Sequence, residues 1–251
     1  MKWQVIVLCK AQMLDINPSD VLNNGLYRKC NTYKGGGGYD KFPDIYQRRY
    51  GGCREGLNNQ FVVQLRGCPL NCPYCYVTRV GVETGDYAIV TTEDMIEAYK
   101  ESDCKVFHLM GGAPALYIDS WHEIIESLSK LNDDSVFHSD LLLVEGVYRE
   151  STVKNLSKYK NTLYAVSIKG DTEEEFYKNT NTKLNKEPFW SNLDTIVKCR
   201  LPFYFTYTGM TEDSIKSFSS KIVERYNDKS LLDNQFAIEL KHYKALDFKF
   251  I

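Results

Sequence analysis

The chain has 251 residues, a length that fits one large domain or two small ones. Hydrophobic residues make up 43% of it and charged residues 25%, which excludes a long disordered chain, a collagen and a coiled coil. The formal net charge of -2 gives no basic field for a nucleic acid partner, and the unusual feature of the composition is its eight cysteines.

The N-terminal residues predict a cytoplasmic protein with no membrane partner. The apolar stretch from Val5 to Cys9 is shorter than the hydrophobic region of a signal peptide and has no small-residue cleavage site. No apolar run elsewhere approaches the length that spans a bilayer. Because thiols stay reduced in the cytoplasm, we expect clustered cysteines to bind metal and scattered ones to pack as small hydrophobic residues.

Residues 10–60 are rich in Asn, Gly, Tyr and Arg and contain four successive glycines at 35–38. Neither a dinucleotide-binding pattern nor a helical pattern accompanies these glycines. We therefore expect an irregular N-terminal extension, residues 1–57, packed on a core domain of residues 58–251. The alternative hypothesis is a lid that contacts substrate. Its side chains would be Tyr46, Arg48, Arg49, Tyr50 and Arg54.

From about residue 61 onward, short β-rich apolar runs alternate with helical patterns. This alternation predicts βαβ units and a parallel sheet, either open or closed into a barrel. In such sheets the chemistry collects in the loops at the carboxyl ends of the strands. The predicted strands are 61–65, 106–110, 141–144, 163–168, 203–207 and 236–240.

Three segments between these strands carry the pattern of a helix N-terminal capping box, namely 91–94, 120–123 and 172–175. After the second of them, apolar residues recur at helical spacing and form one face. That face comprises Ile124, Ile125, Leu128 and Leu131.

Three of the eight cysteines, Cys68, Cys72 and Cys75, follow the first predicted core strand with the spacing Cys-x3-Cys-x2-Cys. Two prolines and a glycine in this loop prevent a helix from separating the thiols. Thiolates favour zinc, copper(I) or iron–sulfur, but a structural zinc site usually has four ligands, and no second Cys-x2-Cys or His pair follows. Three thiolates suit a cubane cluster with one iron left open. The alternative is a set of zinc-binding or core cysteines.

This segment resembles the radical S-adenosylmethionine (radical SAM) superfamily, whose signature has the same cysteine spacing and an aromatic residue where Tyr74 stands. The resemblance implies a partial TIM-type (β/α)6 barrel with mainly parallel strands. It implies a [4Fe-4S] cluster held by the three cysteines, SAM as the second cofactor, and flavodoxin or ferredoxin as the electron donor. The implied reaction is reductive cleavage of SAM to a 5′-deoxyadenosyl radical, which abstracts a hydrogen from the substrate.

Later strand ends carry further matches. The Gly111-Gly112-Ala113-Pro114 stretch resembles the family's Gly-Gly-Glu-Pro loop, which implies main-chain contacts from Gly111 and Gly112 to the amino group of SAM. Ala113 replaces the glutamate and loses its side-chain contact. Glu145 closes the third predicted strand, where the family often places a polar residue near the cofactor ribose; a solvated carboxylate is the alternative.

The stretch from Ser167 through Lys169 to Asp171, followed by Phe176 and Thr180, is similar to one in glycyl-radical-enzyme activases of the pyruvate formate-lyase activating type. In that subfamily the lysine meets the methionine carboxylate, a role that Lys169 would take. Ser167 stands where an aspartate meets the ribose. Residues 238–246 resemble the final activase strand in altered order. The resemblance therefore implies a glycyl-radical enzyme as protein partner.

Two departures from the activases keep other functions open. The residues 76–78 replace the His-Asn-Pro that often follows the activase motif, and Ala113 departs from the family loop. Radical SAM modification of a peptide, nucleoside or small metabolite is therefore the alternative reaction. The non-enzyme alternatives are an iron–sulfur electron carrier and a zinc-binding module.

The remaining five cysteines have no ligand spacing among themselves. Cys104 and Cys199 precede apolar strands and are expected to be structural. Cys53 lies close to the motif, and a hydrogen-donating role toward a product radical is a hypothesis for it. His108 is expected in the core or barrel wall, and His122 and His138 in solvent.

Overall fold

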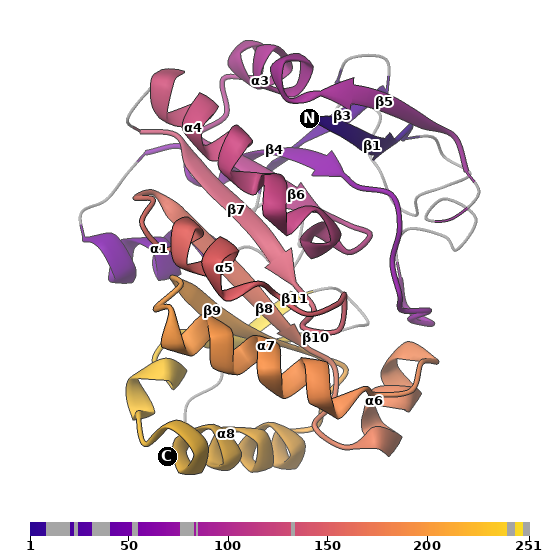
Figure 1. The fold of residues 1–251 in the computed structure, drawn as a ribbon, viewed down its shortest axis with the longest axis vertical. Coiled ribbons are helices and arrows are strands. Elements are labelled where there is room, and N and C mark those ends of the chain that lie inside the picture. The colour runs from indigo at the N-terminus through magenta and orange to yellow at the C-terminus, as the bar shows by residue number, and fades with distance from the viewer. Residues whose placement is uncertain are drawn as a thin grey trace.

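A computed structural model shows one large sheet with helices on its convex side (Figure 1). The structure describes residues 1–8, 21–22, 25–31, 41–51, 55–75, 83, 85–131, 134–239 and 244–247. Across these ranges, every helix is too short or too polar to cross a membrane.

Six adjacent strands of the sheet run parallel, as the repeated βαβ pattern predicts. The predicted α/β fold, a partial (β/α)6 barrel with mainly parallel strands, is therefore confirmed. The parallel strands are β4 (Asn59–Gln64), β6 (Val106–Met110), β7 (Val136–Leu141), β8 (Thr162–Ile168), β9 (Phe203–Thr208) and β10 (Gln235–Glu239).

Helices connect these strands and pack on the outside of the sheet, where they cover its apolar outer residues (Figure 1). Two short 3-10 helices, η3 (Pro114–Ser120) and η4 (Lys229–Leu232), lie in the connections. The α-helices are α3 (Thr92–Glu101), α4 (Trp121–Leu131), α5 (Glu150–Leu156), α6 (Glu173–Thr180), α7 (Lys186–Lys198) and α8 (Glu212–Tyr226).

Both edges of the parallel sheet are extended by antiparallel strands. β3 (Tyr27–Asn31) pairs with β4 and carries β2 (Val21–Leu22), while β11 (Lys244–Asp247) pairs with β10. A separate pair joins β1 (Lys2–Ile6) to β5 (Tyr87–Thr91). N-terminal strands thus pair with strands of the predicted core domain.

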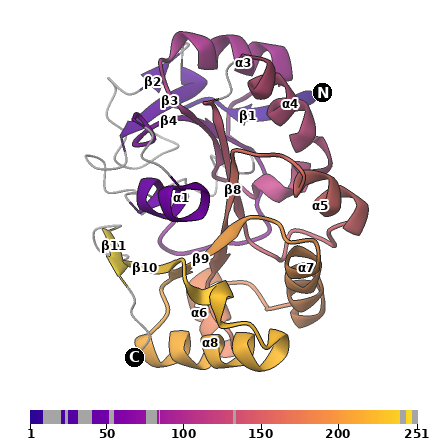
Figure 2. The same cartoon turned by 90° about the vertical axis from the view of Figure 1, so that its left-hand side faces the viewer.

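The concave side of the sheet holds α1 (Phe42–Tyr50), opposite the outer helices (Figure 2). Phe42, Ile45 and Tyr46 of this helix are buried against inward-facing residues of the parallel strands. The predicted irregular extension therefore contains regular structure. Its signals are the i, i+3, i+4 spacing of these three residues and a proline in the first helical turn.

Side chains alternate between the two faces of each parallel strand, and both faces are buried. On β6, Phe107 and Leu109 point outward into the core beneath the helices, whereas Val106 points inward to the cluster around α1. His108 and Met110 share the inward face of Val106 because side chains repeat every second residue. The barrel interior is thus lined by a defined set of side chains.

All six predicted core strands overlap observed strands, but the predicted span 141–144 shares only Leu141 with β7. β7 begins earlier, at Val136, and this start was not predicted because His138, Ser139 and Asp140 interrupt the apolar run. The residues that follow β7 form a turn in which Leu143 has a φ of 65°.

The predicted helix starts have three different outcomes. Thr91 forms the complete capping box with Asp94. The Thr172 hydroxyl accepts from the Glu175 amide at 3.2 Å, but the Glu175 carboxylate accepts from the Asp171 amide. α4 begins at Trp121, directly after Ser120 as predicted, but Ser120 is also the last residue of η3, so the helical chain is continuous there.

Candidate functional site

The cysteine loop, residues 66–75, follows β4 at the carboxyl end of the parallel sheet. Its backbone is held by three separate parts of the chain. The Arg66 amide donates to Gln4 O of β1 at 3.0 Å, and the Asn71 amide donates to Thr180 O at the end of α6 at 2.9 Å. From the loop after β6, the Ala113 amide donates to Gly67 O at 2.7 Å. These bonds fix the backbone that carries the three thiols.

Gly111 and Gly112 follow β6 and lie against the start of the cysteine loop. Their φ angles are 70° and 58°, in the left-handed region that favours glycine. A Cβ on Gly112 would lie 2.6 Å from Gly67 O and closer still to Leu65 O. The glycine pair therefore permits the close approach of the two loops. Its predicted contact with the amino group of SAM stays a prediction.

The three cysteines differ in exposure along their loop. Cys68 and Cys72 are half-buried and Cys75 is exposed, and the Cys75 amide donates to Cys72 O at 3.1 Å. Burial raises the pKa of the Cys68 thiol to about 12, and the neighbouring thiols of Cys72 and Cys75 raise it further. Metal binding at Cys68 must therefore displace a proton.

The three thiols lie close enough to one another to interact electrostatically, since Cys72 and Cys75 both act on Cys68. Thiolates favour zinc, copper(I) or iron–sulfur, and three of them suit a cubane cluster with one iron left open. The donor set fits a cubane.

Lys169, which follows β8, brings a positive charge to the cysteine loop. Its Nζ lies 3.5 Å from Tyr74 Oη and 5.4 Å from the centre of the Tyr74 ring. Burial lowers the pKa of Lys169, but the neighbouring Tyr74, Cys72 and Cys68 outweigh burial and raise it. Burial also raises the pKa of Tyr74 to about 12, against the opposing effect of Lys169. A protonated ammonium therefore stands beside the loop, where it can bind a carboxylate.

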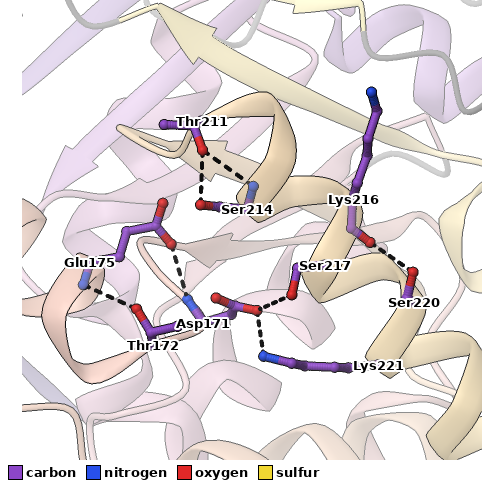
Figure 3. A network of polar contacts seen from close by, with 9 residues as sticks. All are labelled: Asp171, Thr172, Glu175, Thr211, Ser214, Lys216, Ser217, Ser220 and Lys221. Carbon is purple, nitrogen blue, oxygen red and sulfur yellow. Dashed lines mark hydrogen bonds and ion pairs between the residues drawn. The ribbon is translucent and has the colours of Figure 1, made fainter.

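Side chains of α6 and α8 form hydrogen bonds and an ion pair with the loop after β8 that carries Lys169 (Figure 3). The Asp171 carboxylate accepts from Lys221 at 2.6 Å and from Ser217 at 3.2 Å. The Asn179 amide group donates to Lys169 O at 2.8 Å and to Gly209 O at 3.1 Å. These supports could not be predicted from the sequence, since neither Asn179 nor Lys221 belongs to a motif.

Glu145 and Ser167 lie near the other strand ends. The Glu145 carboxylate accepts from the Leu142 amide at 2.8 Å and from the Tyr148 hydroxyl at 2.7 Å. Burial raises the pKa of Glu145, although both hydrogen bonds oppose the rise. Ser167 is half-buried on β8 in register with Thr206. Glu145 thus closes the turn after β7, and the ribose contacts expected of both residues stay predictions.

The predictions for the two histidines on strands have different outcomes. His108 is fully buried in the barrel wall, as expected. His138 is also fully buried, so its predicted solvent position is wrong; it occupies an inward position of β7. Burial lowers the pKa of His108 to about 3, helped by Arg28, and lowers that of His138 well below its usual range. Both rings are therefore neutral.

Tyr46 and Tyr50, which the lid hypothesis places against substrate, bind the main body of the protein, and a contact of theirs with substrate stays a prediction. The Tyr46 hydroxyl donates to Asn161 Oδ1 at 3.0 Å, and the Tyr50 hydroxyl donates to Thr162 O. Both contacts lie at the amino end of β8, the opposite end of the strand from Lys169. Cys53 and Arg54 lie outside the described residues, as do the residues 76–78.

A family model described as "Radical SAM superfamily" matches residues 62–220. A 7-carboxy-7-deazaguanine synthase of Clostridium acetobutylicum is 27% identical over 140 residues, which are 54% of this chain and 59% of that protein. The crystal structure of Streptococcus suis SuiB bound to precursor peptide SuiA matches 93% of this chain and 50% of that chain, with a TM-score of 0.52 and 12% identity. The chain thus spans about half of each, and the likeness to SuiB is one of fold.

Proposed function

Because the family model covers most of the chain, this protein belongs to the radical SAM superfamily, and we propose that it cleaves SAM reductively at a [4Fe-4S] cluster. The observation that carries the proposal is the cysteine loop with the Lys169 ammonium beside it. When bound, the cluster and SAM supply a 5′-deoxyadenosyl radical, which takes a hydrogen atom from the substrate.

In this proposal Cys68, Cys72 and Cys75 hold three irons and leave the fourth open to SAM. A loop whose backbone is bound by three other parts of the chain suits this role, because it would keep the three thiolates at a fixed spacing. The burial of Cys68 protects that part of the cluster from water.

Lys169 is proposed to bind the methionine carboxylate of SAM. Its charge is retained despite burial, and the loop that carries it is clamped by Asn179 and Asp171. Gly111 and Gly112 are proposed to receive the SAM amino group through main-chain carbonyls, with Ser167 and Glu145 toward the ribose and Tyr74 beside the methionine end. Flavodoxin or ferredoxin is the proposed electron donor.

For the substrate, we propose a small metabolite related to a nucleobase. The support is the similarity to a protein named for the synthesis of a deazaguanine. A second candidate is the activation of a glycyl-radical enzyme. It is supported by the stretch from Ser167 to Thr180, whose last residue accepts a hydrogen bond from the cysteine loop.

The test of SAM cleavage is anaerobic. The full-length protein is reconstituted with iron and sulfide, and dithionite and SAM are added. We expect 5′-deoxyadenosine and methionine from the wild type and from Cys199→Ser, whose cysteine caps the C-terminus of α7 and contacts Glu150 O. Cys68→Ala should form neither product. No product from the wild type, or full activity in Cys68→Ala, would overturn the proposal.

The two substrate candidates give different signals in one further experiment. A small-molecule extract from cells grown in deuterated water should transfer deuterium into 5′-deoxyadenosine if a metabolite is the hydrogen donor. Incubation with a glycyl-radical enzyme should instead give the electron paramagnetic resonance signal of a glycyl radical. Deuterium transfer from the extract supports the metabolite, and a glycyl radical with no deuterium transfer refutes it.

A further inference from the structure

Inside the barrel, side chains from β6 and β7 meet in a group that the cysteine loop does not include. His108 and His138 are register partners on adjacent strands, and their ring centres lie 4.1 Å apart. Asp140 follows His138 by two residues and so faces the same side of β7. Its Oδ1 lies 3.6 Å from His108 Nε2. One ligand atom from each of these three residues lies within 4.8 Å of the other two.

Each imidazole is oriented through one ring nitrogen. His108 Nδ1 lies 2.7 Å from Gln60 Oε1, which can only accept, so Nδ1 carries the proton and Nε2 has the lone pair. His138 Nε2 lies 2.9 Å from the Tyr204 hydroxyl. When His138 donates through Nε2, its Nδ1 has the lone pair. Hydrogen bonds of this kind orient metal-binding histidines in proteins.

This group is mostly buried, and Asp140 is its most exposed member. Both histidines are fully buried, and the Phe42 ring of α1 packs 4.4 Å from His138 between ring centres. The Asp140 side chain is 14% exposed. It stands nearer the carboxyl end of the sheet than either histidine, since it follows His138 along β7.

We propose that His108, His138 and Asp140 bind one divalent transition ion, with Zn²⁺ as the expected metal. The ligand atoms would be two imidazole nitrogens and one carboxylate oxygen, a donor set found in catalytic zinc sites and in facial-triad iron sites. Three protein ligands leave a fourth position open. The site is separate from the cysteines, so it does not depend on SAM cleavage.

The positive charge of Arg28 disfavours a cation at this site. Arg28 acts on His108 through its charge, and its Nη2 lies 3.8 Å from Met110 Sδ on the same strand as His108. Repulsion from this guanidinium should weaken the binding of a cation. The Arg28→Gln variant is therefore expected to bind Zn²⁺ more tightly than the wild type. A variant with a damaged structure would usually bind the ion more weakly, so tighter binding points to the lost charge.

The test uses the full-length protein with its cluster assembled. The protein is equilibrated anaerobically with one equivalent of Zn²⁺, desalted, and examined by metal analysis and zinc X-ray absorption. We expect one retained zinc with nitrogen and oxygen ligands. Loss of the zinc on desalting would overturn the proposal. Sulfur ligands at about 2.3 Å would also overturn it, because they would place the metal at cysteines.

Variants locate the metal within the chain. His138→Gln and Asp140→Asn should lower zinc affinity at least about tenfold, and Tyr204→Phe should lower it by about 10- to 100-fold through the orienting bond alone. His122→Gln, a half-buried histidine of α4, is the matched control and should bind as the wild type does. Wild-type affinity in His138→Gln and Asp140→Asn would refute the site. If these variants fail to fold, the ligand identity from X-ray absorption of the wild type decides.

Discussion

The cysteine loop and the barrel interior hold reactive side chains in different ways. Around the cysteine loop the backbone does the positioning, through main-chain hydrogen bonds from β1, the end of α6 and the loop after β6. In the interior, side chains position one another, as Gln60 does for His108 and Tyr204 for His138. The loop should therefore be most sensitive to changes that move the backbone, and the interior to changes of single polar atoms.

The largest effect is expected from a change in the thiols themselves. Cys72→Ser should abolish cluster binding and lower 5′-deoxyadenosine formation to the background, since a hydroxyl is a poor ligand for iron in such clusters. Iron and sulfide content, with the visible spectrum, measures cluster binding. A Cys72→Ser protein with wild-type iron content would show that another residue supplies the third ligand.

The next effect concerns the backbone contact between the two loops. Gly112→Ala places a Cβ against Gly67 O and Leu65 O, so the chain must shift, and we expect a loss of about 3 kcal/mol in the free energy of unfolding. Urea unfolding measures it. The control is Gly51→Ala, which has a φ of 71° but open space around its Cβ and should cost about 1 kcal/mol.

A substitution in the barrel interior should cost less stability than Gly112→Ala. Tyr204→Phe keeps the backbone and the ring and removes one hydrogen bond to His138, so it should cost about 1 kcal/mol in the same urea measurement. Equal losses for Gly112→Ala and Tyr204→Phe would remove the distinction between a backbone-held loop and a side-chain-held interior.

A third effect tests the charge beside the loop. Lys169→Met should raise the Kd for SAM by about 10- to 100-fold, because a charge-assisted hydrogen bond to the carboxylate is lost. Equilibrium binding of SAM to the reconstituted protein measures this Kd. Lys216→Met, an exposed lysine of α8, should leave it unchanged. An unchanged Kd in Lys169→Met would mean that the carboxylate is bound elsewhere.

The smallest effect concerns Glu145, which closes the turn after β7. The pKa of Glu145 is raised in the folded chain, so the folded state binds the carboxyl proton more tightly than the unfolded state does. The protonated carboxyl therefore contributes stability at low pH, and this contribution is lost as the pH rises from the unfolded pKa through the folded pKa. Glu145→Gln lacks this change. The free energy of unfolding of the wild type relative to the variant should therefore fall slightly as the pH rises from 4 to 8, which urea unfolding across this range measures. A difference that rises with pH would contradict the assigned direction.

The same distinction explains how much could be predicted from the sequence. The cysteine loop could be predicted because its three cysteines lie within eight residues of one another in the sequence. Its contact with the loop after β6 also requires glycines at 111 and 112. The parallel sheet could be predicted because strands buried on both faces read as apolar runs. β7 could not, since its inward positions carry His138 and Asp140 and break the run.

The interior group itself was missed for a related reason. Its members come from strands far apart in the chain, so no local spacing brings Gln60, His138 and Tyr204 together before the strand order is known. α1 was not predicted because its apolar face is short, and the concave side of the sheet that this face covers is known only once the strands are assembled. The supports of Lys169 on α6 and α8 depend in the same way on tertiary packing.

The central claim is that three thiolates leave one iron of a cluster open to SAM. Mössbauer spectroscopy of the ⁵⁷Fe-reconstituted protein tests this most directly, because it resolves the individual irons. On addition of SAM, one iron of the four should change its spectrum while the other three stay the same. A spectrum unaffected by saturating SAM, or one without a four-iron cluster, would contradict the claim.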